Sequence, residues 1–295
     1  MTATQPVTLA NETPVSIGIV TLAVRDLPRV SAFYGHVLEL QPMQEDADSI
    51  LLGAGGVGLL RLRHEPNLLP DDPRTAGLFH TAFLMPTRSD LSRWLRRFGE
   101  LGLHLDGASD HIVSEALYLS DPEGNGIEVY ADRPQEAWRR RPDGLDMGTY
   151  PLDIDSLLNA GEQSPYRLPP GLRVGHIHLR VGDLDAAEAF YSGMLGFDVM
   201  ARVPGAAFIA SGGYHHHIGL NVWRSKGAGP RDASRAGLAG FELSAMPDAL
   251  AAARQRLESL GQPHKATDTG LVVADPWGTQ VELRRATNSR EASEG

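Results

Sequence analysis

The side chains available for chemistry in this chain are those of His, Asp, Glu and Tyr, because none of its 295 residues is cysteine. This excludes disulfides, thiolate catalysis, cysteine-ligated zinc and iron–sulfur clusters. Any metal ion must therefore bind to His, Asp or Glu. The first candidates are His80, His176 and Glu128. Two imidazoles and one carboxylate form the facial triad typical of non-haem Fe(II) oxygenases. Whether these three converge depends on the elements that carry them.

These candidates lie within an internal repeat. Residues 17–40 (IGIVTLAVRDLPRVSAFYGHVLEL) align without a gap with residues 174–197 (VGHIHLRVGDLDAAEAFYSGMLGF). Residues 77–105 parallel residues 237–263 more weakly, and both lead on to Asp-Pro-x-Gly and a short strand carrying a Glu. The pattern predicts an alternating strand, an amphipathic helix and three further strands in each copy. We therefore expect four βαβββ modules, at about 14–66, 76–133, 172–226 and 236–286.

The modules divide the chain into an N-terminal pair at 14–133 and a C-terminal pair at 172–286. Between them, residues 134–171 are rich in proline and charge and form a connector. We expect a short helix in it at Asp153–Asn159. The tail after Arg285 is expected to be disordered.

The four-module pattern resembles the vicinal-oxygen-chelate superfamily, which includes glyoxalases, bleomycin-binding proteins and extradiol dioxygenases. Its sequence marks here are Asp-Leu before a helix with a Phe-Tyr pair, and Asp-Pro-x-Gly-x3-Glu before and within a strand. The resemblance covers nearly the whole chain. It implies an α+β fold of four βαβββ modules forming two open mixed β-barrels, but it leaves the reaction open.

The resemblance also implies that metal ligands come from the first and last strands of paired modules. At the first-strand position the four modules carry Ile19, His80, His176 and Gly240. At the last-strand position they carry Leu60, then Glu128, Asn221 and Glu282. The choice of Leu60 requires a gap, and a gapless alignment places His64 there instead. Modules two and three therefore offer the good ligands. We expect His80, His176 and Glu128 to bind Fe(II), with Mn(II) as the alternative metal.

A further motif in module two reads His111-x5-Leu-Tyr118-x2-Asp-Pro-x-Gly-x3-Glu128. It resembles the motif of extradiol ring-cleaving dioxygenases, in which the Glu is an iron ligand and the His and Tyr line the substrate site. Ala108 stands where that family has Gly, a departure that concerns a backbone turn. The resemblance implies O₂ as co-substrate, a small aromatic diol of the catechol type as substrate, and acid–base roles for His111 and Tyr118.

The extradiol family places another acid–base His on a late strand of the module that supplies one iron-binding His. Module three offers His215, His216 and His217 there. Counting back from an inward Asn221, period-two alternation predicts that His217 and His215 point inward and His216 outward, with another register left open. The strings YHHHIGLN and SEALYLSDPEGNGIEVYADRP resemble the catechol-2,3-dioxygenase branch, at Tyr214–Asn221 and Ser114–Pro134.

Two other functions stay open. A glyoxalase-type isomerase or lyase usually uses four protein ligands with two carboxylates, and Asn221 at the fourth position argues against it. A metal-free binding protein of the bleomycin-resistance type would lack the ligands, so the presence of His80, His176 and Glu128 argues against that function.

The composition of the chain limits the kinds of partner that we expect it to bind. The chain has 27 Lys+Arg against 37 Asp+Glu, a net charge of −10, so no basic face is expected to bind nucleic acid. The sequence contains no run of about 18 apolar residues, so it predicts no membrane span. Residues Met1–Thr13 lack the apolar core of a signal peptide. We therefore expect a cytoplasmic protein, a homo-oligomer, with no nucleic-acid or membrane partner.

The distribution of ligands predicts how the modules pair. Pairing within each half would give each barrel only two good ligands. Pairing module two with module three gathers His80, Glu128, His176 and Asn221, together with His111, Tyr118 and the His run. It leaves Ile19, Leu60, Gly240 and Glu282 in a metal-free barrel of modules one and four. A connector of roughly 38 residues is long enough for this arrangement, within one chain or by domain swapping between two.

Overall fold

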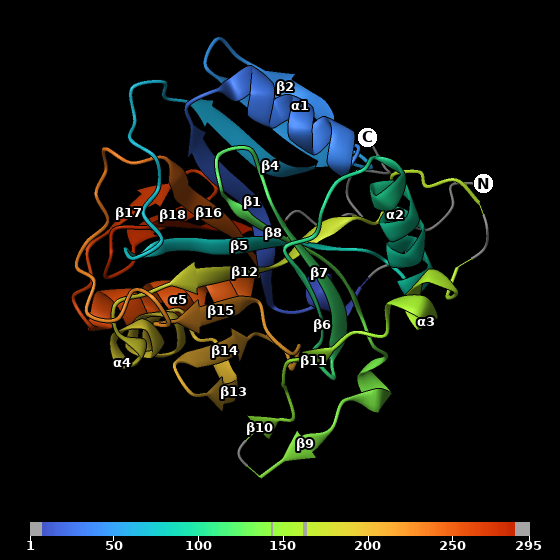
Figure 1. Ribbon diagram of the computed structural model, residues 1–295. Coiled ribbons are helices and arrows are strands. Elements are labelled where there is room, and N and C mark those ends of the chain that lie inside the picture. Colours follow the sequence, from blue (N-terminus) through green and yellow to red (C-terminus); the bar gives the residue numbers. More distant parts are fainter. Residues whose placement is uncertain (1–7, 143, 162–163, 287–295) are drawn as a thin grey trace, which may run out of the picture.

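The computed structural model describes residues 8–142, 144–161 and 164–286, and each predicted module folds as one strand, one helix and three strands (Figure 1). Module one comprises β1 (Val15–Val24), α1 (Leu27–Val37), β2 (Gln41–Glu45), β3 (Ser49–Ala54) and β4 (Val57–His64). Module two comprises β5 (Gly77–Leu84), α2 (Arg88–Glu100), β6 (Gly107–Asp110), β7 (Ser114–Ser120) and β8 (Gly126–Asp132).

The second half of the chain repeats this order. Module three comprises β12 (Arg173–Arg180), α4 (Leu184–Glu188) with a π-helical continuation (Ala189–Met194), β13 (Asp198–Val203), β14 (Ala206–Ala210) and β15 (Ile218–Asn221). Module four comprises β16 (Gly237–Ala245), α5 (Pro247–Ser259), β17 (His264–Thr267), β18 (Gly270–Ala274) and β19 (Gln280–Arg285).

The repeated Asp-Leu and Phe-Tyr marks have structural roles. Asp26 and Asp183 cap α1 and α4, because each carboxylate accepts a hydrogen bond from a backbone N–H of the first helical turn. Tyr34 is fully buried, and its hydroxyl donates to Asp121 at 3.4 Å. The equivalent Tyr191 donates to Asp275 at 3.0 Å. The helix of one module is thus bonded to the Asp-Pro-x-Gly turn of the next.

The strands form two large mixed sheets and a small hairpin. The nine-stranded sheet has the order β11-β6-β7-β8-β5-β12-β15-β14-β13, and the eight-stranded sheet has the order β17-β18-β19-β16-β1-β4-β3-β2. The first strands β5 and β12 pair antiparallel, as do β1 and β16, whereas β8 runs parallel to β5 and β15 parallel to β12. Module two therefore pairs with module three, and module one with module four, within a single chain. The predicted pairing is confirmed.

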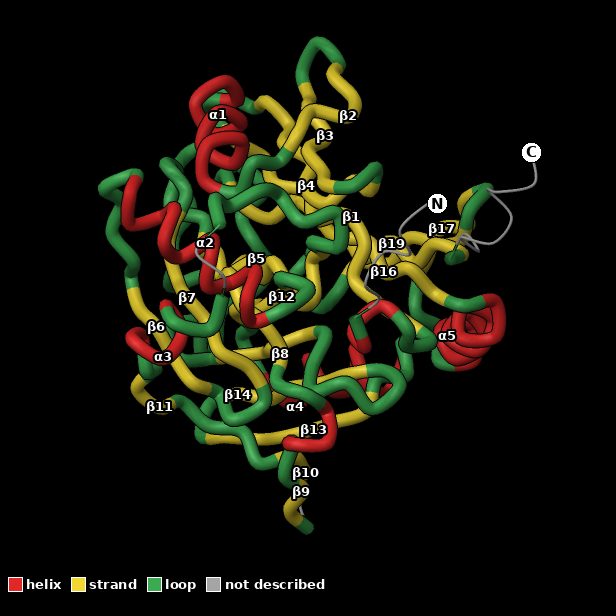
Figure 2. Tube along the Cα trace, turned by 90° about the vertical axis from the view of Figure 1, so that its right-hand side faces the viewer, coloured by secondary structure: helices red, strands yellow, loops and turns green. Residues whose placement is uncertain are grey.

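The helices α1, α2 and α5 lie at the periphery of the molecule, at its outer edges in both views (Figures 1 and 2). The main hydrophobic core contains residues of both large sheets, for example Leu22 and Leu60 of one with Phe83 and Ile177 of the other. The predicted α+β fold with two curled mixed sheets is confirmed. Each half of the chain contributes strands to both sheets.

The connector takes part in the nine-stranded sheet. Its β11 (Tyr150–Pro151) pairs antiparallel with β6, and β9 (Arg140–Arg141) forms a hairpin with β10 (Gly144–Leu145). The short helix α3 (Ile154–Leu158) has Asp153 as its N-cap and Asn159 as its C-cap, which confirms the helix predicted there. The rest of the expected tail, residues 287–295, lies outside the described residues.

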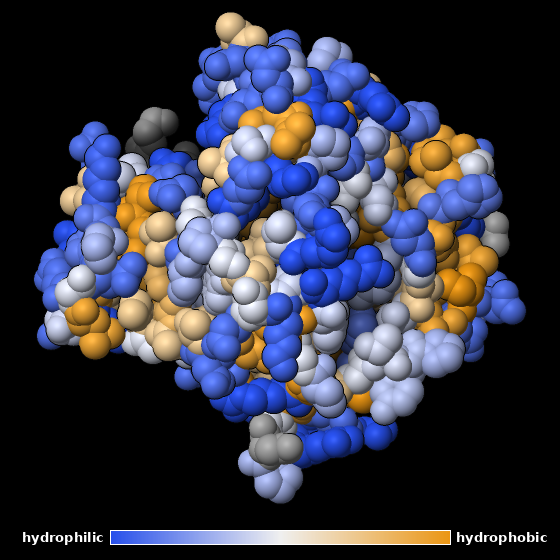
Figure 3. Space-filling view, turned by 60° about the vertical axis from the view of Figure 1, so that its left-hand side comes forward, coloured by the Kyte–Doolittle hydropathy of each residue, from blue (hydrophilic) through white to orange (hydrophobic). Residues whose placement is uncertain are grey.

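Among the residues that the structure describes, no helix is both long and apolar enough to cross a membrane. On the face drawn in Figure 3, hydrophobic residues occupy separate patches between hydrophilic ones.

Candidate metal centre

His80, Glu128 and His176 meet where modules two and three join. Nε2 of His80 lies 2.9 Å from Oε2 of Glu128, Nε2 of His176 lies 3.2 Å from the same oxygen, and the two nitrogens are 3.4 Å apart. All three side chains are buried. Within residues 8–142, 144–161 and 164–286, they are the only group of three or more His, Asp or Glu side chains found with converging ligand atoms.

The spacing of these donor atoms fits one shared ion. Ligands at about 2.1 Å from an octahedral metal lie about 3 Å apart when they occupy adjacent positions. The three observed separations, from 2.9 to 3.4 Å, lie close to that value. A facial arrangement of two imidazoles and a carboxylate also leaves positions for other ligands. The residues therefore form a site that can hold a divalent metal.

The protonation states of Glu128 and His176 suit a metal. Burial alone would raise the pKa of the Glu128 carboxyl, but His176 and His80 outweigh this and hold that pKa well below its usual range. Burial lowers the pKa of His176 to about 4, so its imidazole is neutral near pH 7. Metal ligands must be deprotonated, and Glu128 and His176 need lose no proton first. A cation would compensate the charge of the buried carboxylate.

Strand register brings the three residues together. His176 lies opposite Ala82 in the antiparallel ladder of β12 and β5. Glu128 lies opposite the same residue in the parallel ladder of β8 and β5. Gly126 makes room for His80, because a Cβ at that position would collide with the backbone carbonyl of Phe79 and lie 3.2 Å from the His80 Cβ.

The three candidate ligands line a pocket of about 760 Å³, a volume in the range of small-molecule sites. His111 and Tyr118, the two other predicted module-two residues, also line it. Nε2 of His111 lies 2.5 Å from the Tyr118 hydroxyl, and Nδ1 lies 2.7 Å from the carbonyl oxygen of Gly148. Since a carbonyl only accepts, Nδ1 carries the proton and Nε2 accepts from Tyr118. The connector thus orients His111.

Burial raises the pKa of Tyr118 well above its usual value, and the negative charge of Glu128 adds to this effect. The phenol therefore stays protonated near neutral pH. His111 itself lies in the tight turn between β6 and β7, where Ile112 has a φ of +73°. A β-branched residue rarely adopts this left-handed conformation, so the turn that presents His111 is strained.

The predicted orientation of the His run is wrong. His216 lines the pocket, with its ring centroid 4.0 Å from that of His176, whereas His215 and His217 do not line it. The run precedes β15, which begins at Ile218, and follows a turn in which Gly212 and Gly213 have φ values of +64° and +77°. Because the run is not a strand, period-two alternation does not apply to it.

The two other members of the run do not line the pocket and have different partners. His215 lies with Nε2 at 2.8 Å from Asp132 and Nδ1 at 2.7 Å from Nδ1 of His216. His217 is buried against the N-terminal segment, with Nε2 at 3.0 Å from the carbonyl oxygen of Ala10 and 3.2 Å from the Thr13 hydroxyl. Burial lowers its pKa to about 3.

Sequence reasoning missed His178. It lies two residues after His176 on β12, directly opposite His80, and it lines the pocket with its Nε2 buried and without a hydrogen-bond partner. The alternation His176-x-His178 was the signal that could have revealed it. Asn221 also lines the pocket, with a buried Nδ2 that has no hydrogen-bond partner.

The assignments of Asn221 and Leu60 to the ligand position of Glu128 are wrong. Glu128 pairs with Ala82, two residues after His80. The residues that pair two positions after His176 and Ile19 are Gly219 and Arg61, so these are the equivalents of Glu128. The connection before β4 is a tight turn at Gly55 and Gly56, whereas residues 211–217 precede β15, and this difference places the gap elsewhere.

The fold and the site define a class of protein. The sequence model of the Glyoxalase/Bleomycin resistance protein/Dioxygenase superfamily matches residues 16–129 and 173–283, and the chain belongs to this superfamily. Within it, the chain is 41% identical over 269 residues to a catechol-2,3-dioxygenase of Bacillus subtilis (strain 168), covering 88% of this chain and 93% of that protein. It is 37% identical over 68 residues to biphenyl-2,3-diol 1,2-dioxygenase 3 of Rhodococcus globerulus, covering 22% of this chain and 36% of that one.

Solved structures support the same fold. A putative dioxygenase from Bacillus subtilis superposes with a TM-score of 0.62 at 12% identity, covering 96% of this chain and 88% of that one. Glyoxalase I from Zea mays superposes with a TM-score of 0.56 at 15% identity, covering 95% of each chain. At such identities the likeness concerns the fold alone.

Proposed function

We propose that this protein is an extradiol ring-cleaving dioxygenase, which inserts O₂ into a catechol-type aromatic diol at Fe(II) held by His80, His176 and Glu128. The observation that carries this proposal is the buried triad, open to a pocket that also contains His111 and Tyr118. A relative named catechol-2,3-dioxygenase, 41% identical over most of both chains, supports the same reaction.

Each residue has a defined part in the proposal. Fe(II), held by His80, His176 and Glu128, would bind the diol and activate O₂. Nε2 of His111 accepts the hydrogen bond of the Tyr118 hydroxyl, so a proton from the diol can pass through that hydroxyl to Nε2 and stay close to the ring. His216 lies against His176 and is the residue of the His run that we assign to proton transfer. Burial lowers the pKa of His216 well below its usual value, so its imidazole is neutral near pH 7.

The competing functions differ in their requirements. A glyoxalase-type isomerase would use a fourth protein ligand, and Asn221 offers only a neutral amide in this pocket. A metal-free binding protein would have no use for three converging donors. Mn(II) fits the same ligands as Fe(II). A cytoplasmic location and assembly into a homo-oligomer are further parts of the proposal, to be tested by cell fractionation and by light scattering.

The test is anaerobic purification followed by reconstitution with Fe(II), Mn(II) or Zn(II) separately. Metal content, O₂ uptake and the yellow ring-cleavage product of catechol are then measured. We expect one metal ion per chain, and O₂ uptake that matches yellow product with Fe(II) or Mn(II) only. A protein that binds its metal fully, takes up no O₂ with any catechol and isomerises the hemithioacetal of methylglyoxal and glutathione would overturn the proposal in favour of a glyoxalase.

A further inference from the structure

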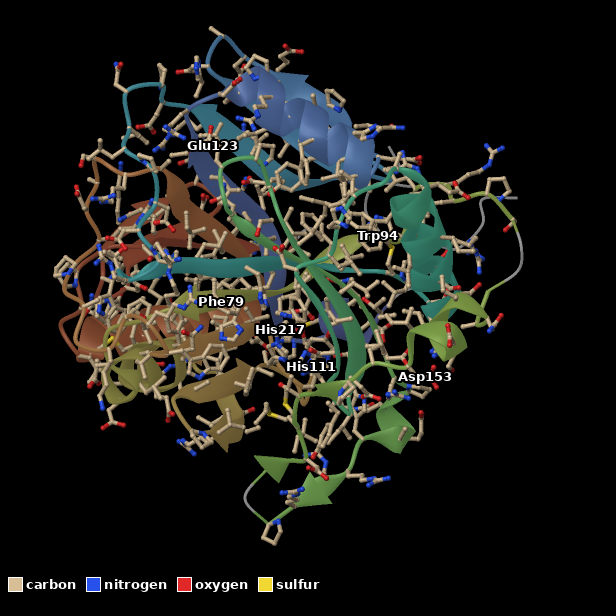
Figure 4. All side chains as sticks on the ribbon, viewed as in Figure 1. Phe79, Trp94, His111, Glu123, Asp153 and His217 are labelled. Atoms are coloured by element: carbon tan, nitrogen blue, oxygen red, sulfur yellow. The ribbon has the colours of Figure 1, made fainter. Side chains whose placement is uncertain are left out.

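A network of hydrogen bonds joins His216 to two residues that do not line the pocket. Nδ1 of His216 lies 2.7 Å from Nδ1 of His215, and Nε2 of His215 lies 2.8 Å from Oδ1 of Asp132. Both imidazoles are buried, whereas Asp132, at the end of β8, is half-buried. Figure 4 labels His217, the next residue after His216, near the middle of the molecule. The network therefore links a ring of the pocket wall to a carboxylate outside the pocket.

Asp132 sets the order of donors and acceptors in this network. An ionised carboxylate can only accept hydrogen bonds, so Nε2 of His215 carries a proton and is the donor. His215 is fully buried, and burial opposes the second proton that would charge its ring. Nδ1 of His215 is then unprotonated and accepts, so Nδ1 of His216 is the donor between the two rings. A neutral His216 has no second ring proton, and its Nε2 therefore carries a free electron pair.

The free nitrogen of His216 is available to a group in the pocket. The ring lines the pocket and lies against His176, with 4.0 Å between the ring centroids. Among the described residues, the one side-chain hydrogen bond found for His216 is that at Nδ1. A base must present an electron pair to the proton that it takes. A neutral His216 does so at Nε2 only in this tautomer, because the other tautomer carries a proton there and can only donate.

A second set of contacts holds Asp132 in place. The Tyr214 hydroxyl donates to its two carboxylate oxygens at 3.2 and 3.0 Å. The Tyr130 hydroxyl lies 2.8 Å from that of Tyr214 and is the donor, because the Tyr214 proton points to the carboxylate. The ring of Trp138 covers His215, with 5.2 Å between the centroids. Asp132 accepts in each of its side-chain contacts with His215 and Tyr214, as an ionised carboxylate does.

The eight-stranded sheet carries no counterpart of this network at the equivalent positions, all of which the structure describes. The repeat aligns Asp132 with Ala286, which has no carboxylate. The connection that leads into β4 is the tight turn at Gly55 and Gly56, where nothing corresponds to the His run. The shared backbone plan therefore does not require the network, which accompanies the candidate ligands instead.

We propose that Asp132 and His215 are positioning residues, which hold His216 as the Nδ1-protonated tautomer and leave its Nε2 free to accept a proton in the pocket. Each acts through the neighbouring ring, since neither lines the pocket. A carboxylate that accepts from an imidazole fixes the tautomer of a catalytic histidine in the same way in other enzymes. The inference rests on the proposed function for its reaction, and adds two residues that act on that site.

The first readout is the position of the proton on His216, which needs no turnover. Long-range ¹H–¹⁵N spectra of histidine-labelled protein, reconstituted with diamagnetic Zn(II), distinguish protonated from unprotonated ring nitrogens, and His216→Phe identifies the His216 signals. We expect the Nδ1-protonated tautomer in the wild type. Asp132→Leu and His215→Phe, which remove the acceptor or the intervening ring, should each give a mixture of tautomers. The control Tyr214→Phe removes one donor to Asp132, leaves the acceptor of His215 intact, and should keep the wild-type tautomer.

The second readout is the change in kcat relative to KM for the Fe(II) holoenzyme with catechol. Asp132→Leu and His215→Phe should lower kcat about 10- to 100-fold, as the loss of such supporting partners does, with KM and iron content little changed. If the tautomers behave as expected but no diol is cleaved, the proposed reaction fails and the positioning role stands. A wild-type His216 protonated at Nε2, an unchanged tautomer in both variants, or an equal loss of the tautomer in Tyr214→Phe would overturn the inference.

Discussion

The two large sheets share one plan, yet candidate ligands converge in only one of them, among the described residues. In both sheets the first strands of two modules pair antiparallel with the same bulge, and the last strands lie parallel beside them. At the positions of His80, His176 and Glu128, the eight-stranded sheet carries Gly240, Ile19 and Glu282. With the backbone plan held constant, a few side chains at equivalent positions separate a metal-binding sheet from a structural one.

At one contact the two sheets reverse which strand carries the small residue and which carries the large one, an exchange of small and large residues. In the nine-stranded sheet Gly126 leaves room for His80, and in the eight-stranded sheet Gly240 leaves room for Gln280. A Cβ on Gly240 would lie 2.6 Å from the Gln280 carbonyl oxygen. In these two strand pairs one large side chain fits at this place, and in the nine-stranded sheet that side chain is His80.

Removing one ligand from each sheet should produce the largest contrast. We expect Glu128→Ala and His176→Ala to lose most bound metal and all measurable turnover, because a site with three protein ligands has none to spare. Glu282→Ala, the matched change in the eight-stranded sheet, should keep both. Metal analysis after reconstitution and O₂ uptake measure the two effects. Full iron occupancy and activity in His176→Ala would falsify the ligand assignment.

The next largest effect separates residues that face the pocket from one that does not. His111→Phe, Tyr118→Phe and His216→Phe should keep the metal but slow ring opening by about 10²–10⁴-fold, the usual contribution of acid–base groups. His217→Gln should alter kcat far less, because His217 is bonded to Ala10 and Thr13 instead of facing the pocket. Stopped-flow measurement of product formation distinguishes them. Equal slowing by His216→Phe and His217→Gln would contradict the orientation seen here.

Much of this arrangement could be predicted because it depends on repetition. The alignment of two pairs of segments located all four modules, and counting ligands then required module two to pair with module three. His80, His176 and Glu128 followed from their equivalent positions on strands, where register is fixed by the pleat. The short connector helix followed from local capping residues at Asp153 and Asn159.

Apart from His178, the misses occur where the pleat is interrupted or where a contact joins distant parts of the chain. Gly212 and Gly213 break the strand before the His run, so alternation assigned the wrong rings to the pocket. The ladder of β5 and β12 skips Phe79, and this bulge reverses the face that alternation would assign to it. The contact of Gly148 with His111 joins the connector to module two and has no local sequence signal. Backbone irregularities and long-range contacts depend on tertiary packing, which periodicity does not report.

A third experiment tests the exchange of small and large residues. Gly126→Ala should lower the free energy of unfolding by about 3 kcal/mol, because the new methyl group meets backbone and not a flexible side chain. It should also weaken metal binding, since His80 must move. Gly240→Ala should destabilise the protein without changing metal affinity. Gly99→Ala, where a Cβ meets nothing within 4 Å in α2, is the control and should not destabilise it. Urea unfolding and metal titration give the two quantities, and unchanged metal affinity in Gly126→Ala would count against the exchange.

The smallest expected effect concerns pH and the seam between the sheets, where His217 contacts the segment that precedes β1. Its folded pKa of about 3 lies below the usual value of about 6.5, so the unfolded chain binds a proton here that the folded chain does not. The contribution of His217 to stability is therefore present above about pH 6.5 and is lost as the pH falls toward its folded value. Between pH 7 and pH 5 this loss should be about 2 kcal/mol, and His217→Gln should remove that part of the pH dependence. Urea unfolding of the metal-free protein at both pH values measures it, with EDTA present so that metal release does not contribute. An identical pH dependence in the wild type and His217→Gln would show that the imidazole is free to take up a proton in the folded state.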